Sequence, residues 1–255
     1  MEVDYAMSNI HTPLFLESPE NKGIVVFIHG FLGSPRQFDR FAQAVHQQGF
    51  STAALLLPGH GCSAKDFGSG TFERWQSFVD AEVERFSQKY AKIWLVGHSM
   101  GGLLAINAAV KHSETVCGIF PIASPLKITI FSMHALKVRA ILLFYRKSHP
   151  VKASYLSGCS VRLTPNMLWH IIKPFFELVR VMRVTRDNLP NVRAPMIAAY
   201  STSDELVSIK SLAMLKSGLD GVDFEELLLS KSLHAYYTED EAARIEQALV
   251  RFVSY

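Results

Sequence analysis

The sequence contains only three cysteines, Cys62, Cys117 and Cys159, and their spacing is irregular. Thiols so few and so widely separated do not form a disulfide framework, and they match no spacing typical of a metal site. We interpret them as reduced thiols. Reduced thiols predict a cytoplasmic protein. Because no metal-ligand spacing is present, we also expect a protein that works without a metal or other cofactor.

Long apolar runs are missing as well. No stretch reaches about 20 apolar residues, the length that a transmembrane helix needs, so we expect no membrane span. Residues 1–5 lack a basic and an apolar region, and we expect no signal peptide. Hydrophobic residues still make up 49% of the 255 residues, which excludes a disordered chain and suffices for one substantial core.

Acidic residues are almost absent from one segment. Residues 126–186 contain eleven Lys and Arg but a single acid, Glu177, so this segment carries +10 while the rest of the chain carries −7. Such a split predicts two parts with different roles. No aromatic–basic stacking pattern or DNA-binding motif accompanies the charge, and we expect no nucleic-acid partner.

Strand-like and helix-like segments alternate through most of the chain. Short, apolar, β-branched runs are typical of strands buried on both faces, and they predict strands at 23–28, 50–57, 92–96, 116–122, 195–200 and 224–229. Some segments have apolar residues at spacings of three and four, and others directly follow a predicted strand. These features predict helices at 35–48, 72–90, 99–112 and 207–216, with a final helix after residue 238.

This alternation predicts an α/β fold with a doubly wound, mostly parallel sheet. It stops at residue 125 and resumes at about residue 189. We therefore predict a core made of residues 1–124 and 189–255, interrupted by a helical insertion over 125–188. Two helix starts are also predicted: Thr71 as an N-cap, and Thr238 with Glu241 as a capping box.

The run Gly97-His98-Ser99-Met100-Gly101 lies between a predicted strand and a predicted helix. A Gly-x-Ser-x-Gly pattern is weak evidence alone, but in this position it is typical of a nucleophile elbow, a tight turn that exposes the serine hydroxyl. The small flanking residues let strand and helix approach closely. Ser99 is the predicted nucleophile.

These residues resemble the α/β-hydrolase superfamily, and within it the small bacterial carboxylesterases and monoacylglycerol lipases. The other segments that carry the resemblance are His29–Pro35, Pro58–Gly61 and Thr71–Trp75. The resemblance covers nearly the whole chain but is weak in the insertion. It implies a shortened N-terminal sheet, a helical cap formed by the insertion, and a triad in the order Ser, acid, His.

His234 and Asp204 are the predicted partners of Ser99 in this triad. Of the histidines after Ser99, only His234 follows the last predicted core strand. Asp204 follows the strand at 195–200, in the position of the family's acid loop. Its neighbour Glu205 could compete, but we interpret it as a charge that precedes a helix.

The resemblance also implies an oxyanion hole. One donor is the backbone N–H of Met100, which follows the nucleophile, and the loop at His29-Gly30-Phe31 suggests the N–H of Phe31 as the second. We interpret three histidines near these loops, His29, His60 and His98, as structural.

The sequence thus predicts a serine esterase that cleaves carboxylic esters, acyl esters or monoacylglycerols, through an acyl-enzyme. Apolar stripes in the insertion either pack the cap or line a pocket for an apolar acyl chain. Its basic residues are either a solvated face or contact a membrane surface transiently. Thioester hydrolysis, acyl transfer, peptide cleavage or C–C bond hydrolysis by the same triad stay open, as does a non-catalytic binding protein.

Overall fold

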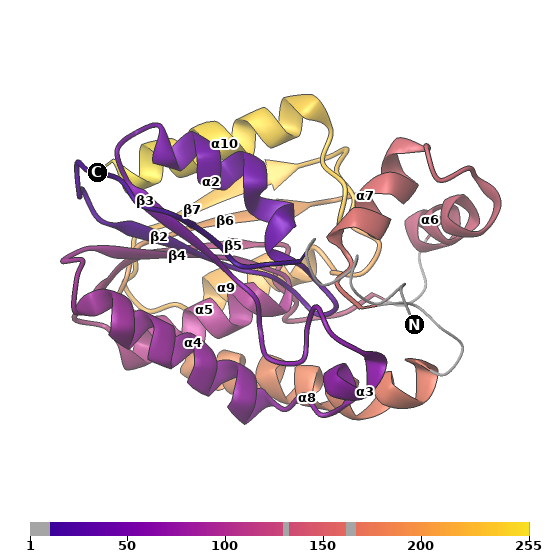
Figure 1. The fold of residues 1–255 in the computed structure, drawn as a ribbon, viewed down its shortest axis with the longest axis horizontal. Helices are drawn as coiled ribbons and strands as arrows, with labels where there is room; N and C mark the ends of the chain where they lie inside the picture. Colours follow the sequence, from indigo (N-terminus) through magenta and orange to yellow (C-terminus); the bar gives the residue numbers. More distant parts are fainter. Residues whose placement is uncertain (1–10, 130–132, 162–166, 255) are drawn as a thin grey trace.

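A seven-stranded sheet forms the centre of the computed structural model, which describes residues 11–129, 133–161 and 167–254. The strand order is β1-β3-β2-β4-β5-β6-β7, and every neighbouring pair is parallel except β1 with β3 (Figure 1). The strands are β1 (Leu14–Leu16), β2 (Ile24–Ile28), β3 (Ser51–Leu55), β4 (Ile93–His98), β5 (Val116–Ile122), β6 (Met196–Ser201) and β7 (Phe224–Leu229). The predicted sheet is confirmed, and the short edge strand β1 was not predicted from the sequence.

Helices cover both faces of this sheet (Figure 1). They are η1 (Pro35–Phe38), α2 (Asp39–His46), α3 (Ala64–Gly68), α4 (Phe72–Ser87), α5 (Met100–Lys111), α6 (Met133–Phe144), α7 (Pro150–Gly158), α8 (Met167–Asn188), η2 (Leu189–Asn191), α9 (Lys210–Gly218) and α10 (Glu239–Val253). The predicted helix at 35–48 begins as a 3-10 turn. The five-residue helix α3 was not predicted, because it is shorter than a periodic pattern can reveal.

Strand β2 shows how the core forms. Its residues are all buried, and they alternate between the two faces of the sheet. Ile24, Val26 and Ile28 face the hydrophobic cluster beneath α4, α5 and α8, whereas Val25 and Phe27 face the cluster beneath α2 and α10. Burial on both faces explains why this strand is apolar throughout rather than alternating with polar residues.

The two predicted helix caps have different outcomes. The Thr71 side chain accepts a hydrogen bond from the N–H of Arg74 at the start of α4, which confirms that N-cap. The capping box at α10 is wrong, because the Thr238 side chain makes no cap hydrogen bond. Glu241 instead binds the backbone of the preceding loop, whose amides compete successfully for its carboxylate.

Residues 125–188 contain α6, α7 and α8, and α6 and α7 lie beyond one end of the sheet (Figure 1). The second half of α8 lies against the sheet's helical layer, where Leu178, Val181 and Met182 join the same buried cluster as Leu103 of α5. The division into a core and a cap over 125–188 stays a prediction.

Candidate active site

Ser99 lies between β4 and α5 in a strained backbone conformation, with φ 54° and ψ −122°. Such a conformation costs free energy and persists only where the surrounding structure enforces it. Close packing enforces it here: a Cβ on Gly97 would lie 2.3 Å from the carbonyl oxygen of Gly101, and a Cβ on Gly101 would lie 1.9 Å from the carbonyl oxygen of Ile28. Both glycines are therefore required by space.

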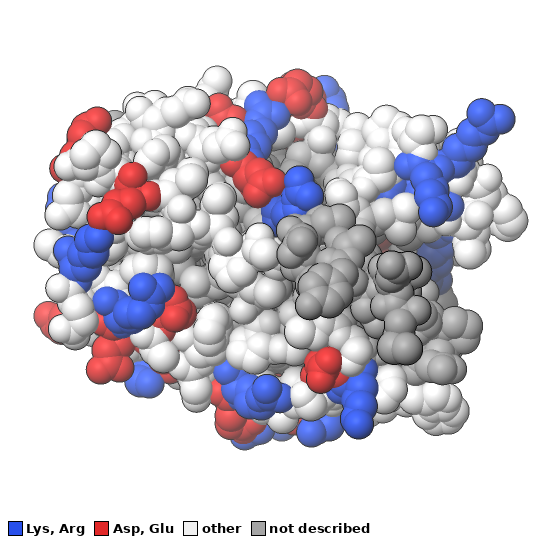
Figure 2. Space-filling model, in the orientation of Figure 1, with Lys and Arg blue, Asp and Glu red and all other residues white. Residues whose placement is uncertain are grey.

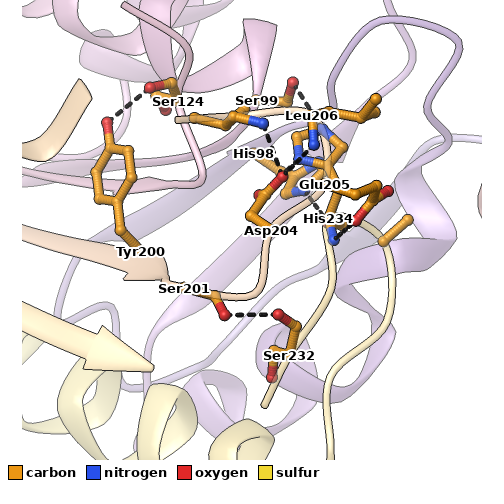
Figure 3. Close-up of polar contacts among 12 residues, drawn as sticks. His98, Ser99, Ser124, Tyr200, Ser201, Asp204, Glu205, Leu206, Ser232 and His234 are labelled. Carbon is orange, nitrogen blue, oxygen red and sulfur yellow. Dashed lines mark hydrogen bonds and ion pairs between the residues drawn. The ribbon is translucent and has the colours of Figure 1, made fainter. Parts of the chain in front are cut away.

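Three predicted residues from distant parts of the chain form one hydrogen-bonded series (Figure 3). His234 Nε2 lies 3.1 Å from Ser99 Oγ, and His234 Nδ1 lies 2.9 Å from Asp204 Oδ2. Asp204 follows β6 and His234 follows β7, so the carboxyl ends of parallel strands bring them to Ser99. This is the geometry that a serine nucleophile, its base and an orienting acid require.

Electrostatics favour a charged Asp204 and a basic His234. Burial by itself raises the pKa of Asp204, but the facing imidazole and the N–H groups of Leu206 and Val207, each 2.8 Å from Oδ1, bring the pKa below its ordinary value. Burial lowers the pKa of His234, but the Asp204 carboxylate, with a contribution from Glu205, raises it above its ordinary value.

Of the three histidines interpreted as structural, His29 and His98 hydrogen-bond to the backbone through their rings. His98 Nε2 donates to the carbonyl oxygen of His234 over 2.8 Å, and burial together with the facing His234 lowers the pKa of His98 to about 3. His29 Nε2 accepts from the N–H of Leu57, so Nδ1 carries the proton and donates to the carbonyl of Gly30. The His60 ring packs edge-on against His29.

The two residues predicted for the oxyanion hole flank Ser99. Met100 is the first residue of α5, where backbone N–H groups have no partner within the helix. Gly30, the residue before Phe31, packs so tightly on Ser99 that a Cβ on it would lie 2.8 Å from the Cβ of Ser99. The Phe31 ring packs edge-on against Phe67. Their role in binding an oxyanion stays a prediction.

A cavity of about 660 Å³ opens beside His234. Its walls are the loop of residues 30–33, the 3-10 helix η1, helix α7 of the insertion and residues 234–237. Most of the lining is apolar, with side chains such as Phe38, Leu142, Leu156 and Leu206. A space of this size is typical of a small-molecule site.

Within the described part of the chain, no group of three or more His, Cys, Asp or Glu could hold a metal ion. Among the helices that the structure describes, none is long and apolar enough to cross a membrane.

The interpretation of Glu205 as a charge that precedes a helix is wrong. Helix α9 begins only at Lys210, so Glu205 does not precede a helix directly. Its buried carboxylate accepts hydrogen bonds from the backbone N–H of His234 and from the hydroxyl of Tyr155 in α7. The position of Glu205 beside the predicted acid was a usable signal, but nothing in the sequence indicated Tyr155.

The fold and this site define an α/β hydrolase with a nucleophile elbow. The chain belongs to the family described as serine aminopeptidase, S33, whose sequence profile matches residues 19–241. It is 26% identical over 234 residues to a thermostable monoacylglycerol lipase of Bacillus sp. (strain H-257), over 91% of this chain and 90% of that protein.

Solved structures share the fold. The chain is similar to a monoacylglycerol lipase of Paleococcus ferrophilus, with a TM-score of 0.73 and 18% identity over 95% of this chain and 98% of that one. It is also similar to a soluble variant of the Saccharomyces cerevisiae monoglyceride lipase, with a TM-score of 0.72 and 15% identity over 94% and 90% of the two chains. The family match and the similarity to the Bacillus lipase identify the chain as a carboxylic ester hydrolase.

Proposed function

We propose that this enzyme hydrolyses acyl esters, with monoacylglycerols as the leading substrate class, through Ser99, His234 and Asp204. The observation that carries the proposal is the continuous hydrogen-bonded series from Asp204 through His234 to the serine in the strained elbow. Similarity to a monoacylglycerol lipase along nearly the whole chain supports the substrate class.

The reaction starts when Ser99 Oγ attacks the ester carbonyl carbon and His234 Nε2 takes the hydroxyl proton. The carbonyl oxygen becomes an oxyanion, which the N–H groups of Phe31 and Met100 stabilise. When the C–O bond to the alcohol breaks, His234 returns the proton to the leaving oxygen and an acyl-enzyme remains. Water then attacks the acyl carbon while His234 takes one of its protons. His234 gives this proton to Ser99 Oγ as the bond between Oγ and the acyl carbon breaks, and the acid leaves.

Labelling with a fluorophosphonate probe tests the nucleophile. Wild-type protein should be modified, and Ser99→Ala should not. Ser203→Ala, a change at a serine of the acid loop whose hydroxyl donates to the carbonyl of Ser230, is the matched control and should label like wild type. Labelling of Ser99→Ala would overturn the assignment.

The apolar cavity supports an apolar acyl chain as the group bound beside His234. A chain-length series of p-nitrophenyl esters and monoacylglycerols tests this, and we expect kcat/KM to rise from acetyl toward medium chains. A preference for acetyl esters contradicts it. Aminoacyl anilides and acyl thioesters in the same panel separate ester hydrolysis from the other reactions that this triad supports.

We also propose that the cap contacts lipid surfaces transiently. Residues 133–161 contain five Lys and Arg and no acid, and the surface over α6 in Figure 2 carries blue side chains without red ones. Large apolar side chains are also exposed on the insertion: Phe144 at 83% and Met133 at 78% in α6, and Trp169 at 80% in α8. Exposed apolar groups among cations are typical of binding to anionic membrane surfaces.

The cytoplasmic location predicted from the sequence is kept as a proposal. Cys62, Cys117 and Cys159 are all free thiols, which supports a reducing compartment.

A further inference from the structure

Glu205 holds a carboxylate beside the predicted base that the reaction above does not use. The residue is only 2% exposed. Burying a carboxylate costs free energy unless hydrogen bonds compensate for the lost water, and the neighbouring Asp204 is a second buried carboxylate. Packing alone does not explain why a carboxylate is buried here, because an apolar side chain would fill the same space without this cost in free energy.

The partners of this carboxylate supply the reason. Glu205 Oε2 accepts the backbone N–H of His234 over 3.0 Å, and Glu205 Oε1 accepts the hydroxyl of Tyr155. Burial and the facing Glu205 raise the pKa of Tyr155, so its hydroxyl stays protonated and donates. Figure 3 shows the Asp204 and Glu205 side chains both directed toward His234.

Three side chains therefore fix His234 at three different atoms. Asp204 binds ring Nδ1, His98 Nε2 donates to the carbonyl oxygen, and Glu205 binds the backbone nitrogen. A base that is anchored at both its backbone and its ring keeps Nε2 directed at Ser99, and small displacements of such a group cost large factors in rate.

Helix α7 extends this anchoring to the insertion. Ser154 Oγ donates to the carbonyl oxygen of Ala235 over 2.5 Å, and the N–H of Ala235 lies 3.5 Å from the Tyr155 hydroxyl. The same helix lines the cavity beside His234. Helix α7 is thus hydrogen-bonded to Ala235, the residue that follows the proposed base His234.

We propose that Glu205 is a positioning residue, which holds His234 through its backbone N–H and, through Tyr155, joins helix α7 of the insertion to the base. This inference rests on the proposed function, because it assigns His234 as the base. It adds a second acidic residue to the support of that base. It also makes the placement of α7, which lines the cavity, a condition for full activity.

Two variants of Glu205 test the first part on the soluble substrate p-nitrophenyl butyrate. Glu205→Ala removes the hydrogen bond, and we expect kcat to fall by about 10- to 100-fold with KM nearly unchanged. Glu205→Gln keeps an oxygen acceptor for the N–H of His234 but removes the charge. We expect it to recover much of kcat.

The pH profile separates positioning from a merely structural role. The titratable groups that face His234 are Asp204, Glu205 and His98, with Tyr155 behind Glu205. Removing the Glu205 charge should move the acidic limb of kcat/KM to lower pH by about 0.5 unit. Glu226→Gln, which removes an exposed carboxylate paired with Lys216, is the control and should leave the limb in place.

Tyr155→Phe tests the second part, with Tyr145→Phe on an exposed residue of the insertion as its control. We expect Tyr155→Phe to lower kcat by about 3- to 10-fold. Because both residues act through one chain of contacts, the double variant of Tyr155→Phe with Glu205→Ala should lose less than the product of the single losses. Independent, multiplying losses overturn the link to α7.

Failure of this inference can be told from failure of the proposed function. If wild-type protein neither labels with fluorophosphonate nor hydrolyses the ester, the proposed function fails. If wild type is active while folded Glu205→Ala and Glu205→Gln match it in kcat and in the acidic limb, only the role of Glu205 is overturned. Should Glu205→Ala fail to fold, Glu205→Gln and Tyr155→Phe still decide the question.

Discussion

His98 Nε2 donates a hydrogen bond to the backbone carbonyl of His234 over 2.8 Å. His98 is the last residue of β4 and directly precedes Ser99. Strand β4, which leads to the proposed nucleophile Ser99, therefore also holds the loop of the proposed base His234. Ser99 and His234 are thus linked through His98 as well as by their own contact.

This relationship predicts that His98→Ala lowers kcat for p-nitrophenyl butyrate by about 10-fold at nearly constant KM, because the base loses one of its anchors. His98→Gln places an amide donor at a similar reach, and part of the rate should return. Steady-state kinetics of the three proteins check this. A wild-type kcat in folded His98→Ala would show that the contact is unimportant.

The pH dependence of kcat/KM should show an acidic limb above the ordinary histidine value of 6.5. In the proposed mechanism only the neutral imidazole of His234 can take the proton of Ser99, and Asp204 raises the pKa of His234. Activity therefore increases as pH rises through this raised pKa. Asp204→Asn removes the charge, so the remaining activity, reduced by about 10³- to 10⁴-fold, should have its limb at lower pH. A limb that stays in place would contradict the assignment.

Glu241 should contribute strongly to stability. It is 1% exposed, and its carboxylate binds the N–H groups of Ser230, Lys231 and Ser232 at 2.7–3.2 Å. Glu241→Ala leaves buried amides unpaired and should cost about 2–4 kcal/mol in the free energy of unfolding, measured with urea. Glu239→Gln, at an exposed surface ion pair with Arg40, should cost less than about 1 kcal/mol.

The contribution of Glu241 should also depend on pH in a defined direction. Burial raises the pKa of this carboxyl, but the amide and hydroxyl donors of the loop bring the pKa below its ordinary value of 4.5. A depressed carboxyl pKa contributes stability that is fully present above 4.5 and is lost as pH falls through the folded-state pKa. The difference in unfolding free energy between wild type and Glu241→Gln should therefore shrink below pH 4.5.

Gly101→Ala should prevent stable folding. The added Cβ would lie 1.9 Å from the carbonyl oxygen of Ile28, a backbone atom at the carboxyl end of β2, so strand and helix must separate. We expect a loss of more than about 3 kcal/mol, seen in thermal unfolding or in soluble yield. For comparison, a Cβ on Gly158 in α7 meets nothing within 4 Å, and Gly158→Ala should leave the stability unchanged within about 1 kcal/mol.

Removing exposed apolar side chains from the cap should weaken binding to vesicles of phosphatidylcholine with phosphatidylglycerol. Phe144→Ser and Trp169→Ser remove the two most exposed of these side chains, and we expect the fraction of protein that sediments with vesicles to fall severalfold. The fall should be larger as salt is added, because salt screens the attraction between the basic side chains and the anionic lipid. Leu228→Ser, at a half-exposed position on the edge strand β7, is the control. Equal binding of all variants contradicts a role for the cap.

The sequence by itself determined the parallel sheet and the elbow. Buried β-branched strands and the glycines around Ser99 are local requirements, because a fully buried strand must be apolar and a tight turn leaves no space for a Cβ. Their positions in the chain also led to Asp204 and His234, since loops after parallel strands meet at one edge of a sheet.

Only the tertiary structure decided which polar groups support the site. Glu205 and Glu241 were each expected to serve the start of a helix, and both instead bind backbone N–H groups of the loop that leads to His234. Tyr155 reaches Glu205 across fifty positions of sequence. A carboxylate binds whichever donors the fold leaves buried and unpaired near it, and that depends on the packing of distant segments rather than on spacing along the chain.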